Sequence, residues 1–63
     1  MPLTLRTARL RRGVSVTELA HAVGVNRSTI TRLETGLRLP LHDTAQRLEK
    51  VLECALKFTR VSR

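Results

Sequence analysis

The chain has 63 residues, a net charge of +7 and a single aromatic residue. A chain of this length builds one small domain, so multidomain enzymes and nucleotide-binding α/β sheets are excluded. Ten of the twelve basic residues are arginines, and the planar guanidinium group suits phosphates and guanine edges. Because tryptophan and tyrosine are absent, the anchors of a basic membrane-surface peptide are missing. The composition therefore favours nucleic acid as the partner and predicts no membrane association.

Residue types that carry catalysis or metal binding are sparse in this sequence. Cys54 is the only cysteine, and His21 and His42 stand far apart without acidic neighbours at catalytic spacing. The sequence holds neither a Cys/His cluster of zinc-site spacing nor a glycine elbow or phosphate-binding loop. We therefore expect no enzyme activity, no metal, no cofactor and no small-molecule ligand. The lone thiol is expected to be buried or half-buried in a reducing compartment.

Three glycines divide the first two-thirds of the chain into segments that each begin with the sequence pattern of a helix N-terminus. Glycine readily adopts the left-handed conformation that follows a helix, and the three positions are Gly13, Gly24 and Gly36. The first segment opens at Thr4, a candidate N-cap. The second opens at Ser15, which matches a capping box with Glu18. The third opens at Asn26, another candidate N-cap, so three short helices are expected in a row.

A fourth helix is expected after Pro40, with Asp43 as its cap. Its apolar residues recur with a period near 3.6, and they are Ala45, Leu48, Val51 and Leu52. Beyond Leu52 the larger apolar residues alternate with smaller or polar ones, a period of two that is typical of a strand. Two interpretations stay open for this tail, since the fourth helix could also run on or fray.

A strand in the tail would need a second strand to pair with. The sequence predicts no other strand in this chain, and an unpaired strand edge promotes aggregation. If the strand forms, we expect it to pair with its copy in a dimer, which places three side chains at the dimer interface: Leu56, Phe58 and Val61. The alternative is that these side chains cover the bottom of the core of one monomer.

The second and third segments together have the spacing of a helix-turn-helix. Ala20 is small where the two helices cross, Gly24 allows a tight turn, and Val25 fills the corner. Ile30 and Leu33 would fasten the second helix of the motif onto the core. In a helix-turn-helix this second helix enters the major groove of DNA.

Several short stretches match one family pattern in register: residues 5–9, 13–15, 18–20, 24–30 and 32–36, then Pro40. Over residues 5–52 the chain therefore resembles the lambda-repressor-like, Cro-type (XRE) helix-turn-helix family. The resemblance implies an all-α, compact four- to five-helix domain that acts as a dimer on a palindromic operator. It also implies an ion pair between Arg9 and Glu34, and an unpaired Arg9 on the apolar face of its helix would be costly.

Two positions depart from the family pattern. The family commonly has a phosphate-contacting glutamine at the first residue of the second helix, and this chain has Val16 there. The family commonly has a serine before the fourth helix, and this chain has Leu41. The loss of that serine is why we expect Asp43 to take over as the cap.

The exposed face of the third segment, opposite Ile30 and Leu33, is expected to read DNA bases. It carries four residues that match the base-reading positions of the family: Asn26, Arg27, Ser28 and Arg32. The two arginines are the expected guanine readers, whereas Asn26 could instead serve only as an N-cap. Contacts with DNA phosphates are expected from Ser15 and Thr31, and the resemblance implies further ones from Thr35 and Arg38. Thr31 could instead touch a thymine methyl.

Two functions are consistent with these features. The first is a sequence-specific, double-stranded DNA-binding transcriptional regulator, most simply a small dimeric repressor that reads a palindromic operator with its third helix in the major groove. The second is an antitoxin that represses its own operon and binds a toxin protein, because the tail resembles the β tail of some antitoxin members of the family. The expected division is a DNA-binding domain over residues 1–53 and a tail over residues 54–63. The expected location is the cytoplasm of a bacterium or a phage-infected cell, on the nucleoid when DNA is bound.

Overall fold

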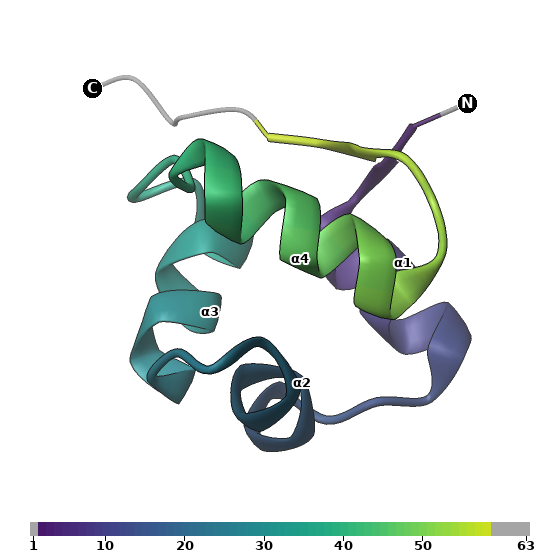
Figure 1. Cartoon of the computed structure of the whole chain (residues 1–63), viewed down its shortest axis with the longest axis horizontal. Helices are drawn as coiled ribbons and strands as arrows, with labels where there is room; N and C mark the ends of the chain where they lie inside the picture. The colour runs from purple at the N-terminus through teal and green to yellow at the C-terminus, as the bar shows by residue number, and fades with distance from the viewer. Residues whose placement is uncertain (1, 59–63) are drawn as a thin grey trace.

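The computed structural model describes residues 2–58, in which four helices pack around one core and a short two-stranded sheet joins the two ends (Figure 1). In chain order the elements are β1 (Leu3–Thr4), α1 (Leu5–Arg12), α2 (Val16–Val23), α3 (Arg27–Thr35), α4 (His42–Leu52) and β2 (Leu56–Lys57). This architecture confirms the predicted helical class. Among the described residues, no helix is long and apolar enough to cross a membrane.

The first three helices begin and end where the sequence predicts, because local interactions define their ends. Thr4 Oγ1 accepts a hydrogen bond from the Thr7 backbone N–H at 3.3 Å. Ser15 Oγ accepts from the Glu18 N–H at 3.0 Å, and Glu18 Oε1 accepts from the Ser15 N–H at 3.1 Å, which completes the capping box. The bond from the Ser15 N–H holds the pKa of the Glu18 carboxyl below its usual value. The helices end at glycines with positive φ: Gly13 at 67°, Gly24 at 82° and Gly36 at 78°.

The fourth helix begins earlier than the sequence predicts. It starts at His42, with Leu41 in the N-cap position (φ −66°, ψ 156°) and no side-chain capping bond among the described residues. The Leu41 carbonyl accepts a hydrogen bond from the Ala45 N–H at 2.9 Å, so the first turn already includes Asp43. The prediction that Asp43 caps this helix is therefore wrong. Its carboxylate lies instead in the first turn, where a negative charge suits the helix dipole.

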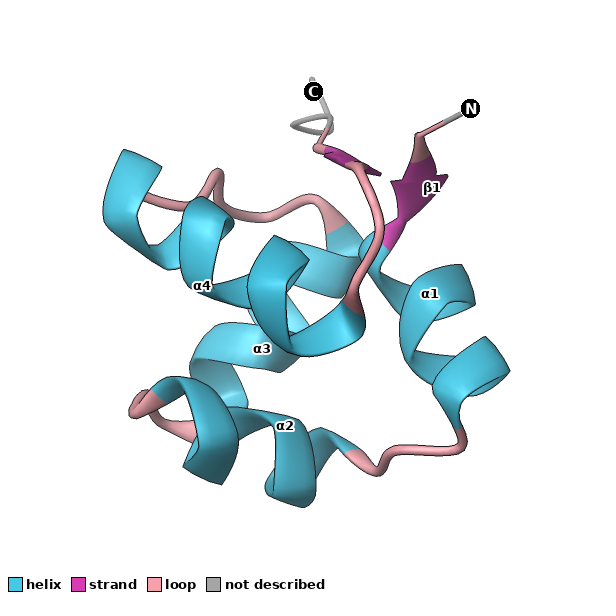
Figure 2. Ribbon diagram, turned by 45° about the vertical axis from the view of Figure 1, so that its right-hand side comes forward, coloured by secondary structure: helices cyan, strands magenta, loops and turns pink. Residues whose placement is uncertain are grey.

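The tail after α4 forms a short strand, which was one of its two predicted conformations. Glu53 ends α4 with a φ of 54°, so the helix does not run on. β2 pairs in parallel with β1, with Leu3 opposite Leu56 (Figure 2). The Leu3 N–H donates to the Ala55 carbonyl at 3.0 Å, and the Leu56 N–H donates to Glu49 Oε2 at 2.9 Å. Backbone and side-chain bonds thus both hold the tail in place.

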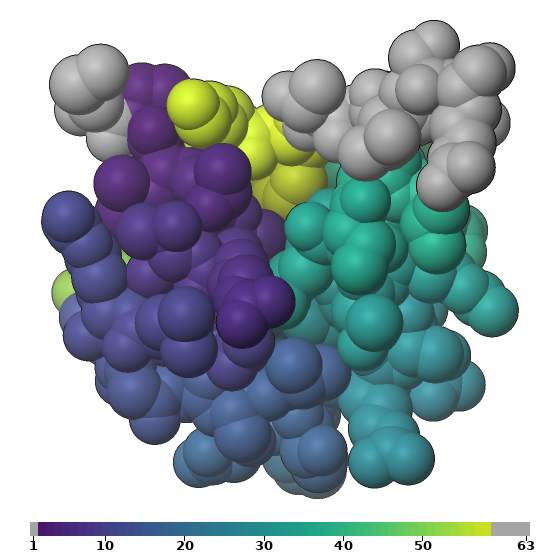
Figure 3. Space-filling view, turned by 180° about the vertical axis from the view of Figure 1, so that it is seen from behind, coloured from purple at the N-terminus to yellow at the C-terminus, as the bar shows by residue number. Residues whose placement is uncertain are grey.

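The expectation that this strand lacks a partner in its own chain is therefore wrong. The partner is β1, a two-residue strand that is too short to show a period in the sequence. Figure 3 shows the N-terminal and C-terminal ends of the described chain, purple and yellow, next to each other. Leu56 and Phe58 are half-buried against the core of their own chain, as the alternative interpretation predicted. Val61 lies outside the described residues.

Apolar side chains from all four helices form one core. Leu19, Ile30 and Leu48 are fully buried at its centre. The other buried members are Leu5, Ala8, Ala20, Val23, Leu33 and Leu52. Each large aliphatic side chain buried in this way stabilises the fold by roughly 1.5–3 kcal/mol. Leu19 and Ile30 belong to α2 and α3, so burying them attaches both helices of the motif to the core.

Candidate nucleic-acid interface

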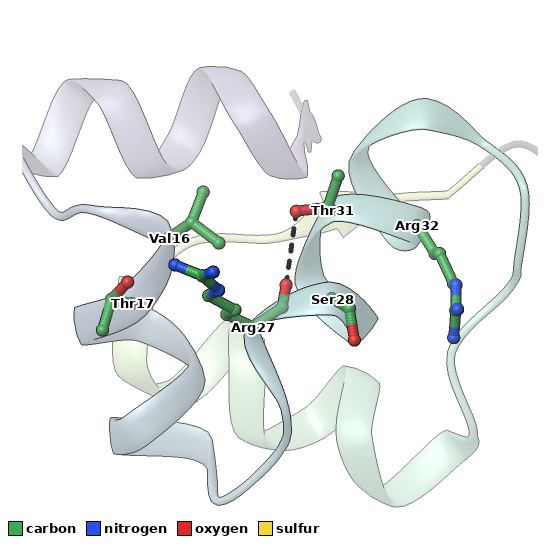
Figure 4. Close-up of a pocket in the computed structure, with 6 residues that line it drawn as sticks. All are labelled: Val16, Thr17, Arg27, Ser28, Thr31 and Arg32. Atoms are coloured by element: carbon green, nitrogen blue, oxygen red, sulfur yellow. Dashed lines mark hydrogen bonds between the residues drawn. The ribbon is translucent and has the colours of Figure 1, made fainter.

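α2 and α3 form a helix-turn-helix with one groove on its outer side. Gly24 turns the chain, and the Val25 N–H donates to the Ala20 carbonyl at 3.0 Å, which closes the turn. Ile30, with 0% of its surface exposed, fastens α3 to the core. The start of α2 and the first two turns of α3 thereby border a groove (Figure 4), which is lined by Val16, Thr17, Arg27, Ser28, Thr31 and Arg32.

Three of the four predicted base readers line this groove. Arg27, Ser28 and Arg32 are all exposed on α3. Figure 4 shows the side chain of Arg27 extending toward Val16 and Thr17, whereas Arg32 extends away from them. In the described part of the chain, the lining includes two guanidinium groups and no carboxylate. The groove is therefore positively charged and offers two planar, bidentate hydrogen-bond donors.

Asn26 lies just outside the groove, at the residue before α3. Its backbone has the extended conformation of an N-cap (φ −72°, ψ 145°), but its side chain makes no capping hydrogen bond with any described residue. The side chain is exposed, so both its amide donor and its carbonyl acceptor are available. This is the pair of groups that matches the major-groove edge of adenine.

The hydroxyls of Thr31 and Thr35, two predicted phosphate contacts, are engaged within α3. Thr31 Oγ1 donates to the Arg27 carbonyl at 3.3 Å. Thr35 Oγ1 lies 3.0 Å from the Thr31 carbonyl and 3.3 Å from the Arg32 carbonyl. A phosphate oxygen accepts hydrogen bonds, so either hydroxyl must leave its helix carbonyl before it can donate to DNA. These two residues are consequently weaker phosphate candidates than their positions indicate.

The other two predicted phosphate contacts, Ser15 and Arg38, have free donors in different places. The Ser15 hydroxyl only accepts in its bond with the Glu18 N–H, so its hydrogen remains available to a phosphate at the start of α2. Arg38 is exposed in the segment after α3. It lines a second, smaller cavity together with Pro40 and Thr44 and does not border the groove.

Arg9 and Glu34 meet as an ion pair that connects α1 with α3. Arg9 Nε donates to Glu34 Oε2 at 2.6 Å, and Arg9 Nη2 lies 3.4 Å from Glu34 Oε1. Arg9 Nη1 also donates to the Val14 carbonyl at 2.9 Å. Only 11% of the Arg9 side chain and 9% of the Glu34 side chain are exposed, so water screens the pair weakly. Neither residue lines the groove, and the pair connects α3 to α1.

Two features of this surface were not predicted from the sequence. Val16 and Thr17 contribute a wall of the groove, and only the departure of Val16 from the family pattern drew attention to that position. Three leucines between α3 and α4 are exposed: Leu37 at 67%, Leu39 at 48% and Leu41 at 71%. Their alternation with Arg38 and Pro40 is visible in the sequence, but their exposure is not.

Comparison with known proteins places this architecture in a family. The family model described as Helix-turn-helix matches residues 5–58. The chain belongs to the XRE-type helix-turn-helix family. This membership confirms the resemblance carried by the second and third segments, and the match extends through the tail strand β2. Helix-turn-helix domains of this type bind DNA.

The sequence is also similar to that of a protein whose name describes a regulatory function. Over 53 residues the chain is 38% identical to a protein of Methanocella arvoryzae named as an HTH-type transcriptional regulatory protein. The match covers 84% of this chain and 16% of the relative. The chain therefore spans about a sixth of that relative's length. No solved structure matched the chain.

Proposed function

We propose that the chain is a sequence-specific transcriptional regulator that binds double-stranded DNA with α3 in the major groove. The observation that carries this proposal is the outer face of α3, where Arg27 and Arg32 are exposed in a groove without a carboxylate among its described lining residues. The opposite face of the same helix is anchored by Ile30 and Leu33. A rigid helix with two exposed guanidinium forks suits guanine edges.

Each side chain on this face has a separate role in the proposal. Arg27 and Arg32 each bind the O6 and N7 atoms of one guanine. Each of these bidentate contacts contributes roughly 1–3 kcal/mol of discrimination against the other bases. Ser28 and Asn26 add hydrogen bonds to neighbouring base edges. Ser15 and the positive end of α2 bind a phosphate, which sets the depth of α3 in the groove.

The protein acts in this proposal as a dimeric repressor on a palindromic operator. The leucine row, defined as Leu37, Leu39 and Leu41, supports a second copy as the dimer partner. We infer an interaction surface from three exposed leucines in one short segment, and two identical half-sites require a contact that is two-fold symmetric. The row directly follows α3, so a contact there fixes the distance between two recognition helices. The half-sites are then about one helical turn apart.

Replacing Leu41 with glutamate tests this contact. Because 71% of Leu41 is exposed, L41E should leave the fold intact, while a carboxylate forced into an apolar contact should weaken the dimer about tenfold or more. Sedimentation equilibrium and binding to whole and half operators measure the effect. Leu10→Glu is the matched control, since Leu10 is a 56% exposed leucine on α1. A Leu41→Glu protein that dimerises as tightly as Leu10→Glu would exclude the leucine row.

In vitro selection of duplexes from a random library tests the function itself. We expect enrichment of one site with two-fold symmetry and a guanine contacted in each half. The selected site should bind about a thousandfold or more tighter than random duplex. Enrichment of no sequence would contradict sequence-specific binding, and an asymmetric site would contradict the dimer.

The antitoxin hypothesis was motivated by the resemblance of the tail to the β tail of some antitoxin members of the family. In this chain one edge of β2 is paired with β1. Leu56 and Phe58 also pack against the core. Of the two hypotheses we therefore propose the regulator.

A further inference from the structure

We propose that Val16 and Thr31 form a methyl-reading surface, which recognises the 5-methyl group of a thymine next to the guanine bound by Arg27. Both residues line the groove between α2 and α3, together with Arg27 (Figure 4). The inference rests on the proposed DNA-binding function and adds a substrate preference to it. The preferred class is duplex DNA with a 5-methylpyrimidine beside guanine.

Thr31 offers an apolar group to the groove. Its hydroxyl donates to the Arg27 carbonyl at 3.3 Å, so the hydroxyl hydrogen is already used within α3. The side chain is exposed, so its methyl can contact a ligand, while its oxygen can still accept a hydrogen bond. A threonine in this state donates no hydrogen bond to DNA and offers its methyl as an apolar contact.

Val16 supplies a second apolar group on the facing helix. It is the first residue of α2, half-buried and packed against the core, so its position is well defined. An isopropyl group can neither donate nor accept a hydrogen bond, and it cannot make the phosphate contact that glutamine makes at this position in the family. The groove therefore has apolar groups from both helices and the Arg27 guanidinium in the same lining.

This arrangement matches one set of base edges in the major groove. Thymine alone among the four bases presents a methyl group there, whereas adenine and cytosine present amino groups, which do not make this apolar contact. Apolar side chains contact the thymine methyl favourably, and arginine binds guanine through two hydrogen bonds. The methyl-reading surface thus distinguishes thymine from cytosine, while Arg27 selects the adjacent guanine.

Deoxyuridine provides the test, because it differs from thymidine only by the missing methyl. In the selected operator, each thymine is replaced in turn by uracil, and affinity is measured by fluorescence anisotropy at one salt concentration. At one position in each half-site we expect the loss of the methyl to weaken binding about fourfold, the value for removing one buried methylene-sized group. The remaining thymines should tolerate the replacement.

Protein variants connect the effect to the two residues. Thr31→Ser removes only the methyl and retains the hydroxyl, and Val16→Ala shortens the other apolar group. Each should reduce the fourfold preference for thymine over uracil, because each removes part of the apolar contact. Thr29→Ser is the matched control, because it removes the same methyl from a half-buried residue of α3 that lies outside the groove. It should retain the fourfold preference for thymine.

The outcomes separate this inference from the proposed function. If selection gives a site but no thymine shows the preference, or if both groove variants keep it, the methyl-reading surface is overturned while DNA binding stands. If selection gives no site, both proposals are overturned. Melting curves identify a variant that has lost its fold, and the thymine–uracil comparison on the unmodified protein remains decisive in that case.

Discussion

Replacing Arg9 with methionine should lower the free energy of unfolding by about 3 kcal/mol, because it leaves the Glu34 carboxylate nearly buried without its partner. Both side chains are about nine-tenths covered, and the substitution also removes the donor that binds the Val14 carbonyl. A domain of this size has a total stability of only about 5–15 kcal/mol. Urea unfolding followed by circular dichroism measures the change.

Two further variants show whether the effect comes from burial. Arg12→Ala breaks the other ion pair, Arg12 Nη2 to Glu53 Oε2 at 3.3 Å, whose side chains are 46% and 70% exposed. It should cost less than about 1 kcal/mol. Replacing Arg9 and Glu34 together with apolar residues should recover most of the stability that R9M loses. Equal losses for R9M and R12A would mean that burial does not set the contribution of the ion pair to stability.

Replacing Arg32 with alanine should weaken binding to the selected operator by about 1–3 kcal/mol, the discrimination of one bidentate contact with guanine. Binding to random duplex should fall far less, because only one charge is lost. Arg27→Ala should act in the same way at a neighbouring base. Anisotropy titrations on both duplexes, at several salt concentrations, measure the two effects separately.

Arg47→Ala is the matched control for the arginines. Arg47 is exposed on α4 and does not line the groove, so the variant loses the same charge without losing a base contact. Its specific and random binding should change equally. If R32A also weakens both duplexes equally and reduces the log–log salt slope by about 0.9, Arg32 contacts a phosphate and not a base.

Local chemistry explains which parts of the fold were predictable. The capping box of Ser15 and Glu18 spans four consecutive residues, and each glycine turn needs only one, so the signals for α1, α2 and α3 are contained in the segments themselves. At the start of α4 two residues compete for the N-cap position. Asp43 is the better capping residue, but the Leu41 backbone accepts the bond from Ala45, and that geometry depends on how the preceding segment packs.

The candidate site was predictable in position but less so in chemistry. The alternation of buried and exposed residues on α3 locates Arg27 and Arg32 on the outer face. Which hydroxyls are free could not be read from the pattern, since Thr31 and Thr35 donate to helix carbonyls. The contribution of Val16 to the same groove depends on how α2 crosses α3, which is a tertiary property.

The amino-acid sequence by itself determined the helix-turn-helix, because its helix ends, its turn and its apolar face all follow from residues close together in the chain. Tertiary structure alone decided the partner of the tail strand. Leu3 and Leu56 lie at opposite ends of the chain, and they pair only because the packing of α1 and α4 brings those ends together. The same packing half-buries Leu56 and Phe58 and leaves the leucine row exposed. Contacts between distant residues depend on the whole core, and no local pattern encodes them.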